Sequence, residues 1–264
     1  MTLEILDTRG ATVRKYSTND QQRALDESQS FPTYWLRPPF PLSKKIGLNR
    51  FVWDLRYERP QATRYGYTIG AAYGEDAILV PEGPLVSPGT YQVKLTVAGR
   101  SYTAPIEVKM DPRVKIAPLA LNQQVALEKE IVAAMNQSFA AVQQLTELRA
   151  QLKALLNAGT ADAAITEAAG AFDKKVAELL AVETQYPPVG IVSVAALNGS
   201  LGSLLLLVEG ADTAPTAQAS ETFATYKRLL DQQLVKWEQL KGKDLAALNE
   251  LLRQRQLPPI KTSE

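Results

Sequence analysis

The sequence has no histidine and no cysteine in 264 residues. Without histidine the chain lacks the side chain that most often acts as a general base near neutral pH, and it cannot build a Ser-His or Cys-His nucleophilic pair. Zinc, copper and non-haem iron also lose their preferred ligands, which leaves only oxygen-rich sites for calcium or magnesium. The sequence has no EF-hand calcium loop, phosphate-binding Gly-rich loop or dinucleotide fingerprint. We therefore expect neither a metal nor a cofactor.

The chain also lacks an excess of positive or negative charge. The formal net charge is +1, with 29 Lys and Arg against 28 Asp and Glu. Residues 1–112 carry 14 basic and 12 acidic side chains, and residues 113–264 carry 15 and 16. Averaged over either part, this balance does not provide the electrostatic footprint of a protein that binds DNA, RNA or anionic lipid. We expect no nucleic-acid partner.

One uncharged stretch, Val189–Val208, is as long as a membrane-spanning helix. It contains Asn198 and is flanked by Glu183 and Glu209, whereas a spanning helix usually has basic flanks and aromatic anchors. We predict instead a central, buried helix of a bundle, and no membrane span. Three small residues would let a neighbouring helix approach it closely: Ala195, Gly199 and Ser203.

What the sequence does contain is a change of hydrophobic period at Asp111-Pro112-Arg113. Before this point apolar residues alternate, as is typical of half-buried strands: Tyr91, Val93, Leu95 and Val97. After it they recur every three or four residues, as is typical of amphipathic helices: Val132, Met135, Phe139 and Val142. The pattern predicts an α+β protein of two modules. Residues 1–112 would form a small antiparallel β-sandwich, and residues 113–264 an antiparallel helical bundle.

The strands are predicted from alternation between turns that contain Pro, Gly or Asp. We expect two hairpins and one further strand: Thr2–Leu6 with Ala11–Tyr16, Thr90–Val97 with Ser101–Met110, and Gly47–Tyr57. In the last strand, alternate residues would share one face, with Trp53 in the core: Phe51, Trp53, Leu55 and Tyr57.

The helical half is predicted to contain four long helices and a short fifth. Pro118 would begin the first helix, which runs to about Asn157, and Thr160 would cap a second that runs to about Gln185. The remaining boundaries are expected at these residues: Glu209 ends the uncharged helix, Pro215 begins the fourth, Gly242 interrupts it, and Asp244–Arg253 forms the last.

The absence of histidine and cysteine does not exclude glycoside hydrolysis, since this reaction needs only two carboxylates. Asp54 and Glu58 would lie on one face of a strand, but four residues at ~3.3 Å each separate their backbones by ~13 Å, beyond the ~5–9.5 Å that either mechanism uses. Glu75 and Asp76 are adjacent in an irregular loop. We predict that both pairs are solvated surface acids and that the chain is not an enzyme.

Aromatic residues gather in two loops rich in Pro and Gly, residues 31–41 and 57–73. The candidate ligand or interface residues are Tyr34, Trp35, Arg64, Tyr65, Tyr67 and Tyr73. Exposed rings beside arginine can stack on sugars or anchor a protein interface. The alternative is structural. The loops would then fold back and fill the ends of the sandwich, because a small sandwich needs all the apolar area that it can bury.

Several motifs resemble known bacterial regions. Two segments of the chain resemble the Ig-like domain of flagellar hook-capping proteins: Gly47-Leu48-Asn49-Arg50-Phe51-Val52-Trp53-Asp54 and Pro88-Gly89-Thr90-Tyr91. Nearly the whole chain resembles a bacterial C-terminal region that follows sortilin-like, BNR-repeat β-propellers. That region is often labelled glycosyl hydrolase. That resemblance rests on Asn49–Tyr57, Lys109-Met110-Asp111-Pro112-Arg113 and Leu257-Pro258-Pro259-Ile260. These motifs are turns, a core tryptophan and an inter-domain link, and none is catalytic.

The resemblance implies an Ig-like sandwich, a helical bundle and a non-catalytic accessory module at the C-terminal end of an exported bacterial β-propeller protein. The module would support the propeller or dock against it or another protein. The alternative function is a carbohydrate-binding module that uses the loops 31–41 and 57–73. Met1 leads directly into the strand Thr2–Leu6, so no signal peptide is expected in the chain itself. The missing cysteine excludes disulfides but leaves the compartment open.

Overall fold

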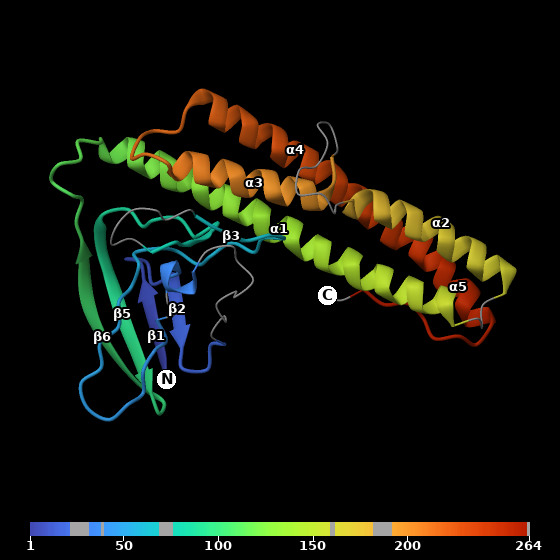
Figure 1. Cartoon of the computed structure of the whole chain (residues 1–264), viewed down its shortest axis with the longest axis horizontal. Helices are drawn as coiled ribbons and strands as arrows, with labels where there is room; N and C mark the ends of the chain where they lie inside the picture. Colours follow the sequence, from blue (N-terminus) through green and yellow to red (C-terminus); the bar gives the residue numbers. More distant parts are fainter. Residues whose placement is uncertain (22–31, 38–39, 69–75, 159–161, 182–191, 263–264) are drawn as a thin grey trace. The chain divides into compact units, whose positions relative to one another are not determined.

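The computed structural model describes residues 1–21, 32–37, 40–68, 76–158, 162–181 and 192–262. Antiparallel sheets occupy the N-terminal half of the sequence and helices the rest (Figure 1). This arrangement confirms the predicted α+β class.

The chain forms two compact units that alternate along the sequence. The first unit comprises Met1–Pro60, Tyr65–Glu130 and Leu205–Pro215, and the second comprises Gln61–Arg64, Ile131–Leu204 and Thr216–Glu264. Helix α1 (Pro118–Asn157) and helix α3 (Val194–Glu209) each contribute residues to both units. The units therefore do not coincide with residues 1–112 and 113–264. That those two parts fold independently stays a prediction.

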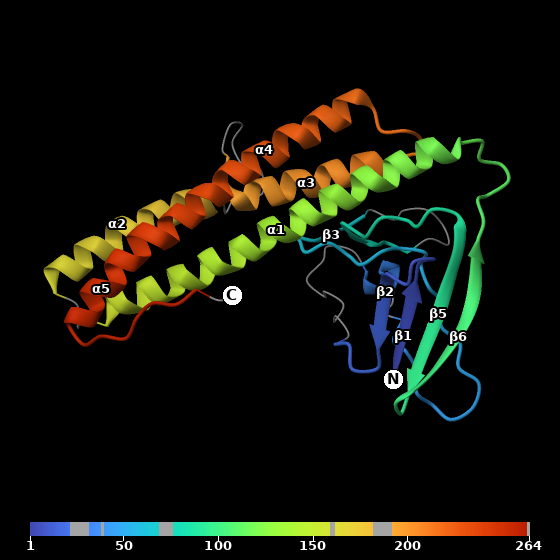
Figure 2. The same ribbon diagram turned by 180° about the vertical axis from the view of Figure 1, so that it is seen from behind.

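Four antiparallel strands form the main sheet of the first unit. Their order is β2 (Thr12–Ser17), β1 (Thr2–Leu6), β5 (Gly89–Val97) and β6 (Arg100–Val108), as Figure 2 shows. Both predicted hairpins are therefore confirmed. Alternation places Ile5 and Val13 in the core with Tyr91 and Val86, because successive side chains of a strand point to opposite faces.

The predicted strand Gly47–Tyr57 is wrong. Within it only Arg56 makes a bridge, to Leu85, and the remainder has no ladder. Leu55 has a φ of 61° and is exposed, so the alternation breaks at this residue. Trp53 still packs against the core, edge-to-face with Tyr91 at 5.8 Å between ring centres. In the described residues the second sheet consists of two short strands, β3 (Gly66–Tyr67) and β4 (Leu79–Val80).

The second unit is helical. It contains the greater part of α1, then α2 (Ala163–Leu180), most of α3, α4 (Ala217–Gln239) and α5 (Ala246–Gln254). Helix α2 runs alongside α4 and α5 (Figure 1). Leu145, Leu148 and Leu152 of α1 are fully buried, as their spacing of three and four residues predicts.

Some helix ends follow the prediction and others do not. The bounds of α1 and the end of α3 are confirmed. Helix α2 is capped by Asp162, whose carboxylate accepts the N–H of Ile165 at 3.0 Å, and Thr160 lies outside the described residues. Helix α4 begins at Ala217, after its cap Thr216, and not at the predicted Pro215. The interruption predicted at Gly242 is a change of helix type: α4 ends at Gln239, and a π-helix, Leu240–Leu245, joins it to α5.

Helix α3 has one buried and one exposed side. Leu201 is fully buried, whereas Leu207 is 67% exposed. Of the three small residues predicted to admit a neighbouring helix, Ala195 is buried, whereas Gly199 and Ser203 are exposed. The prediction is therefore wrong for Gly199 and Ser203. None of the helices in the described part of the chain has both the length and the hydropathy needed to cross a membrane.

Candidate functional site

Tyr34 and Trp35 lie in a short turn at the surface of the first unit. Both belong to the 3-10 helix η1 (Thr33–Trp35), and their rings meet edge-to-face with centres 6.4 Å apart and planes at 89°. Tyr34 is 79% exposed and Trp35 is 40% exposed. These two neighbouring rings are therefore at the surface and do not fill the end of the sheet.

The residue that follows η1 anchors it. Leu36 is buried and forms a parallel bridge with Ala77, which is also buried. Ala77 donates its N–H to the carbonyl of Trp35 at 2.6 Å, and Arg37 donates its N–H to the carbonyl of Ala77 at 3.0 Å. Because these contacts hold the backbone, the outward position of Tyr34 does not depend on burial of its own ring.

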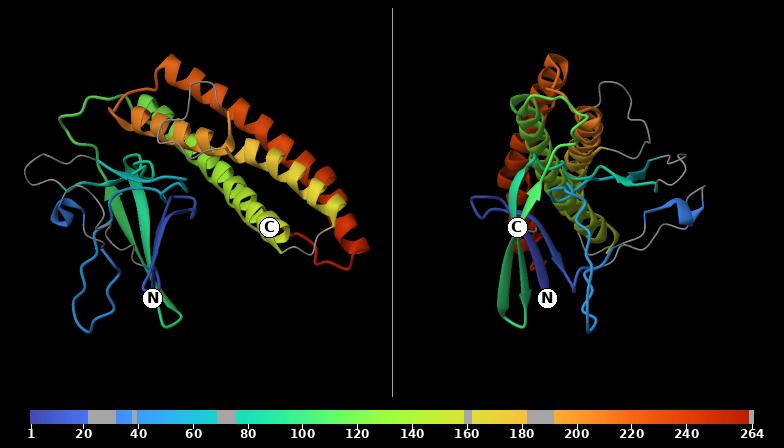
Figure 3. Two further views of the ribbon diagram at one scale, coloured as in Figure 1. Left: turned by 45° about the vertical axis from the view of Figure 1, so that its right-hand side comes forward. Right: turned by 90° about the vertical axis from the view of Figure 1, so that its left-hand side faces the viewer.

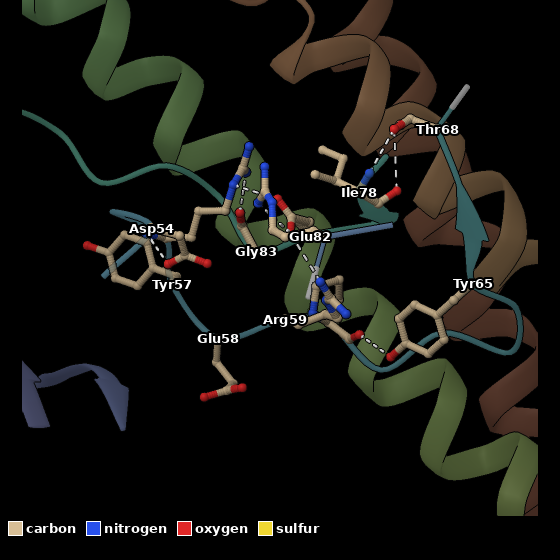
Figure 4. A network of polar contacts seen from close by, with 12 residues as sticks. Asp54, Tyr57, Glu58, Arg59, Tyr65, Thr68, Ile78, Glu82 and Gly83 are labelled. Atoms are coloured by element: carbon tan, nitrogen blue, oxygen red, sulfur yellow. Dashed lines mark hydrogen bonds and ion pairs between the residues drawn. The ribbon is translucent and has the colours of Figure 1, made fainter. Parts of the chain in front are cut away.

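The other predicted tyrosines differ from this pair. Tyr65 is half-buried, its hydroxyl donates to the carbonyl of Pro60 at 2.7 Å, and the guanidinium of Arg59 lies 5.9 Å from its ring centre (Figure 4). Tyr67 is half-buried in β3. Tyr65 thus stabilises the fold of its own loop. Tyr73 lies outside the described residues.

Arg64 is exposed and belongs to the second unit, in the segment Gln61–Arg64. The buried amide of Asn198 holds this segment in place. It donates to the carbonyl of Gln61 at 3.2 Å and accepts the N–H of Thr63 at 2.8 Å. Arg64 is thus presented to solvent from a backbone that is fixed by a buried side chain.

A charged cluster that sequence reasoning missed lies in the first unit. At its centre is Glu82, which is 6% exposed. Its carboxylate forms ion pairs with Arg56 at 2.9 Å, Arg59 at 3.1 Å and Arg37 at 3.8 Å. Figure 4 shows Arg59 and Glu82 meeting from different segments of the chain. The Arg56 side chain is largely buried and that of Arg59 is partly buried, so the cluster compensates the buried charge of Glu82.

Arg56 extends the charged cluster toward the helices of the same unit. Its guanidinium donates to the carbonyl of Gly83 at 2.7 Å and pairs with the carboxylate of Glu209, at the end of α3. One arginine therefore joins two acids and a backbone carbonyl.

Gly83 makes this geometry possible through a close backbone approach. A Cβ at this position would lie 2.2 Å from the carbonyl oxygen of Tyr57 and 2.5 Å from that of Glu58. Any larger residue must push apart the two segments that carry Glu82 and Arg56.

The substitution Gly83→Ala is expected to lower the free energy of unfolding by about 2 kcal/mol, because overpacking against backbone cannot be relieved by a rotamer change. Urea denaturation measures the loss. Gly66→Ala is the matched control, since no described atom lies within 4 Å of a Cβ at that position. Equal losses in the two variants would show that the close approach at Gly83 is not the cause.

Glu128 of α1 is a second buried acid of the first unit, 2% exposed. Its Oε1 has no hydrogen-bond partner within the described part of the chain. Burial, with the carboxylates of Glu209 and Asp212, raises the pKa of Glu128 to about 7, although Gln124 and Arg56 act in the opposite direction. Burial also raises the pKa of Glu209. Near neutral pH, therefore, Glu128 exchanges between its charged and neutral forms.

The raised pKa of Glu128 predicts that stability falls as the pH rises from 4.5 to about 7. In this window the native state holds a proton that the unfolded chain has released, so unfolding becomes easier with rising pH, by about 3 kcal/mol in total. Glu128→Gln keeps a neutral side chain. We expect it to match the wild type at pH 4.5 and to be more stable at pH 8 in urea denaturation. An unchanged pH slope in the variant would contradict the assignment.

Among the described residues no group of three or more His, Cys, Asp or Glu is placed to hold a metal ion. Asp54, Glu58 and Asp76 are exposed, as predicted for surface acids, and Glu75 lies outside the described residues. What the charged cluster does is cross-link segments of the first unit.

No protein-family model, curated protein or solved structure matches the chain. The resemblance to the region that follows sortilin-like propellers stays a prediction.

The sequence does carry a signal for the buried acids. Glu82 lies between Pro81 and Gly83 in an otherwise uncharged stretch. Glu128 follows Val125 by three residues and precedes Ile131 by three, so it falls on the apolar face of its helix. An acid at such a position is a candidate for burial with a partner. The partners themselves are remote in sequence and leave no comparable signal.

Proposed function

We propose that the chain is a non-catalytic interaction module that docks against a folded protein through η1. The observation that carries the proposal is the exposed Tyr34–Trp35 pair, held outward by buried Leu36. Tyrosine and tryptophan are the side chains that most often dominate binding energy at interfaces, and rings on a fixed backbone lose little entropy on binding. Arg37, whose side chain is half-exposed, adds a polar group at the edge of the pair.

The partner that we propose is a β-propeller of an exported bacterial protein. Support comes from the sequence resemblance, in which the matching motifs are structural and lie along nearly the whole chain. A neighbouring propeller would cover this exposed aromatic pair.

The carbohydrate-binding alternative has weaker support in the geometry. A sugar stacks on a flat ring face, but the rings of Tyr34 and Trp35 are perpendicular and cannot form one continuous platform. Tyr65 is half-buried, and its hydroxyl is engaged by Pro60.

A photo-crosslinking experiment tests the proposal. A benzophenone amino acid replaces exposed Tyr34, and in a control chain it replaces exposed Ser220 of α4. After irradiation in extracts of the source cells, we expect a discrete adduct with a propeller protein only from position 34. Trp35→Ala should abolish it.

A glycan array with the wild type and Trp35→Ala supplies the competing outcome. Specific glycan binding that the variant loses, without an adduct at position 34, would replace docking by the carbohydrate-binding function. Adducts of equal yield from positions 34 and 220 would contradict docking through η1.

A further inference from the structure

The turn at residues 43–50 carries the two most exposed large apolar side chains of the described residues. Ile46 and Leu48 have relative exposures of 106% and 103%. The exposed cations Lys44, Lys45 and Arg50 flank them. Figure 3 shows this part of the chain, in blue, extending to the same end of the main sheet as the turn between β5 and β6.

Hydrogen bonds within the turn fix its shape. The side-chain amide of Asn49 donates to the carbonyls of Lys45 at 2.8 Å and Gly47 at 3.0 Å, and Ser43 Oγ accepts the N–H of Lys45 at 3.3 Å. Gly47 has a φ of 102°, a backbone conformation that glycine adopts more readily than any other residue. Ile46 and Leu48 are thus held on either side of Gly47 by the backbone and not by a hydrophobic core.

The charge around the turn has one sign. Residues 28–53 include four Lys or Arg and no Asp or Glu, a bias that the balanced total for residues 1–112 conceals. Exposed aliphatic side chains among cations match the interface of an anionic bilayer, where alkyl groups enter between the headgroups and the cations remain at the phosphates. Lysine is depleted in protein interfaces and leucine is under-represented among their hot spots, so this composition favours lipid over protein.

We propose that the turn 43–50 docks the chain peripherally on an anionic lipid surface. Ile46 and Leu48 insert between the headgroups, and Lys44, Lys45 and Arg50 contact the lipid phosphates. This contact is separate from η1, so it does not depend on the proposed function.

Sedimentation with vesicles tests the proposal on the whole chain. Vesicles of phosphatidylcholine and phosphatidylglycerol in equal parts are compared with phosphatidylcholine alone. We expect binding to the mixed vesicles that weakens with salt and that falls about tenfold in the double variant Ile46→Ser, Leu48→Ser. The triple variant Lys44→Gln, Lys45→Gln, Arg50→Gln should lose the preference for the anionic vesicles.

Leu119→Ser is the matched control, because Leu119 of α1 is another exposed leucine, at 69%. It should bind like the wild type. Since Ile46 and Leu48 are fully exposed, the double variant should keep the wild-type circular dichroism and melting temperature. Equal losses of binding in the Leu119→Ser and double variants would overturn the proposal.

A fluorescent label measures insertion directly, and the cysteine-free sequence allows a single label. The nitrobenzoxadiazole label on Ile46→Cys should become brighter and shift to the blue on the mixed vesicles, while the same label on Ser220→Cys should not change. Binding without this change would mean that the turn does not insert, and would overturn the proposal. Absence of vesicle binding would also overturn it, and would leave a protein as the occupant of this surface.

Discussion

Replacing Leu201 with lysine is expected to unfold the protein. Leu201 lies in α3 with 0% of its surface exposed, so a lysine at this position would begin in the apolar interior of the second unit. An unpaired ammonium group in such a place costs at least several kcal/mol, which is comparable with the ~5–15 kcal/mol that stabilises a typical domain. The measurement is thermal unfolding followed by circular dichroism, in which the variant should show no cooperative transition.

Leu207→Lys on the same helix is the matched control. Leu207 is 67% exposed, so the new charge stays in water, and the free energy of unfolding should change by no more than ~0.5 kcal/mol. If Leu201→Lys instead retained the wild-type melting temperature, the face of α3 that carries Leu201 would have to be solvated, and the arrangement of the second unit would be wrong.

The sequence predicted those elements whose signals are local and repeated. The alternation in β1 and β5 and the period of three to four residues in α1 each extend over several residues, and each is supported by a turn or by Pro118. In α3 the absence of charge predicted a buried helix. It could not show which side is buried, because leucines occur on both.

The prediction failed where side-chain contacts, both local and remote in sequence, decide the backbone. Residues 47–57 alternate like a strand, yet Trp53 donates its indole N–H to the carbonyl of Arg56 at 3.1 Å and Leu55 adopts a left-handed conformation. Arg56 is in turn held by Glu82 and Gly83. These side-chain bonds turn the chain away from a ladder, and no local propensity reveals them.

The same limit applies to the candidate site. Composition singled out Tyr34 and Trp35, and both are exposed. Composition alone could not separate them from Tyr65, which is half-buried because its hydroxyl meets the backbone of Pro60. The partners of such a ring become visible only in three dimensions.

Replacing Glu82 with glutamine is expected to lower the free energy of unfolding by about 3 kcal/mol. The change keeps the size of the side chain but removes the carboxylate that Arg37, Arg56 and Arg59 share. Breaking a buried ion pair from one side leaves the other charge uncompensated. The loss should lie at the lower end of the usual range, because the side chains of Arg37 and Arg59 are 50% and 31% exposed and water solvates them in part.

Two further variants assign this loss to the charged cluster. Arg37→Gln should cost less than about 1 kcal/mol, since Arg37 is half-exposed and 3.8 Å from the carboxylate. In the double variant Glu82→Gln, Arg56→Gln the loss should be smaller than the sum of the two single losses, because each substitution removes the group that the other leaves unpaired. Strictly additive losses, measured by urea denaturation, would contradict a shared cluster. Arg37 directly follows Leu36, the anchor of η1, so a cluster that meets these expectations also helps to hold Tyr34 and Trp35 at the surface.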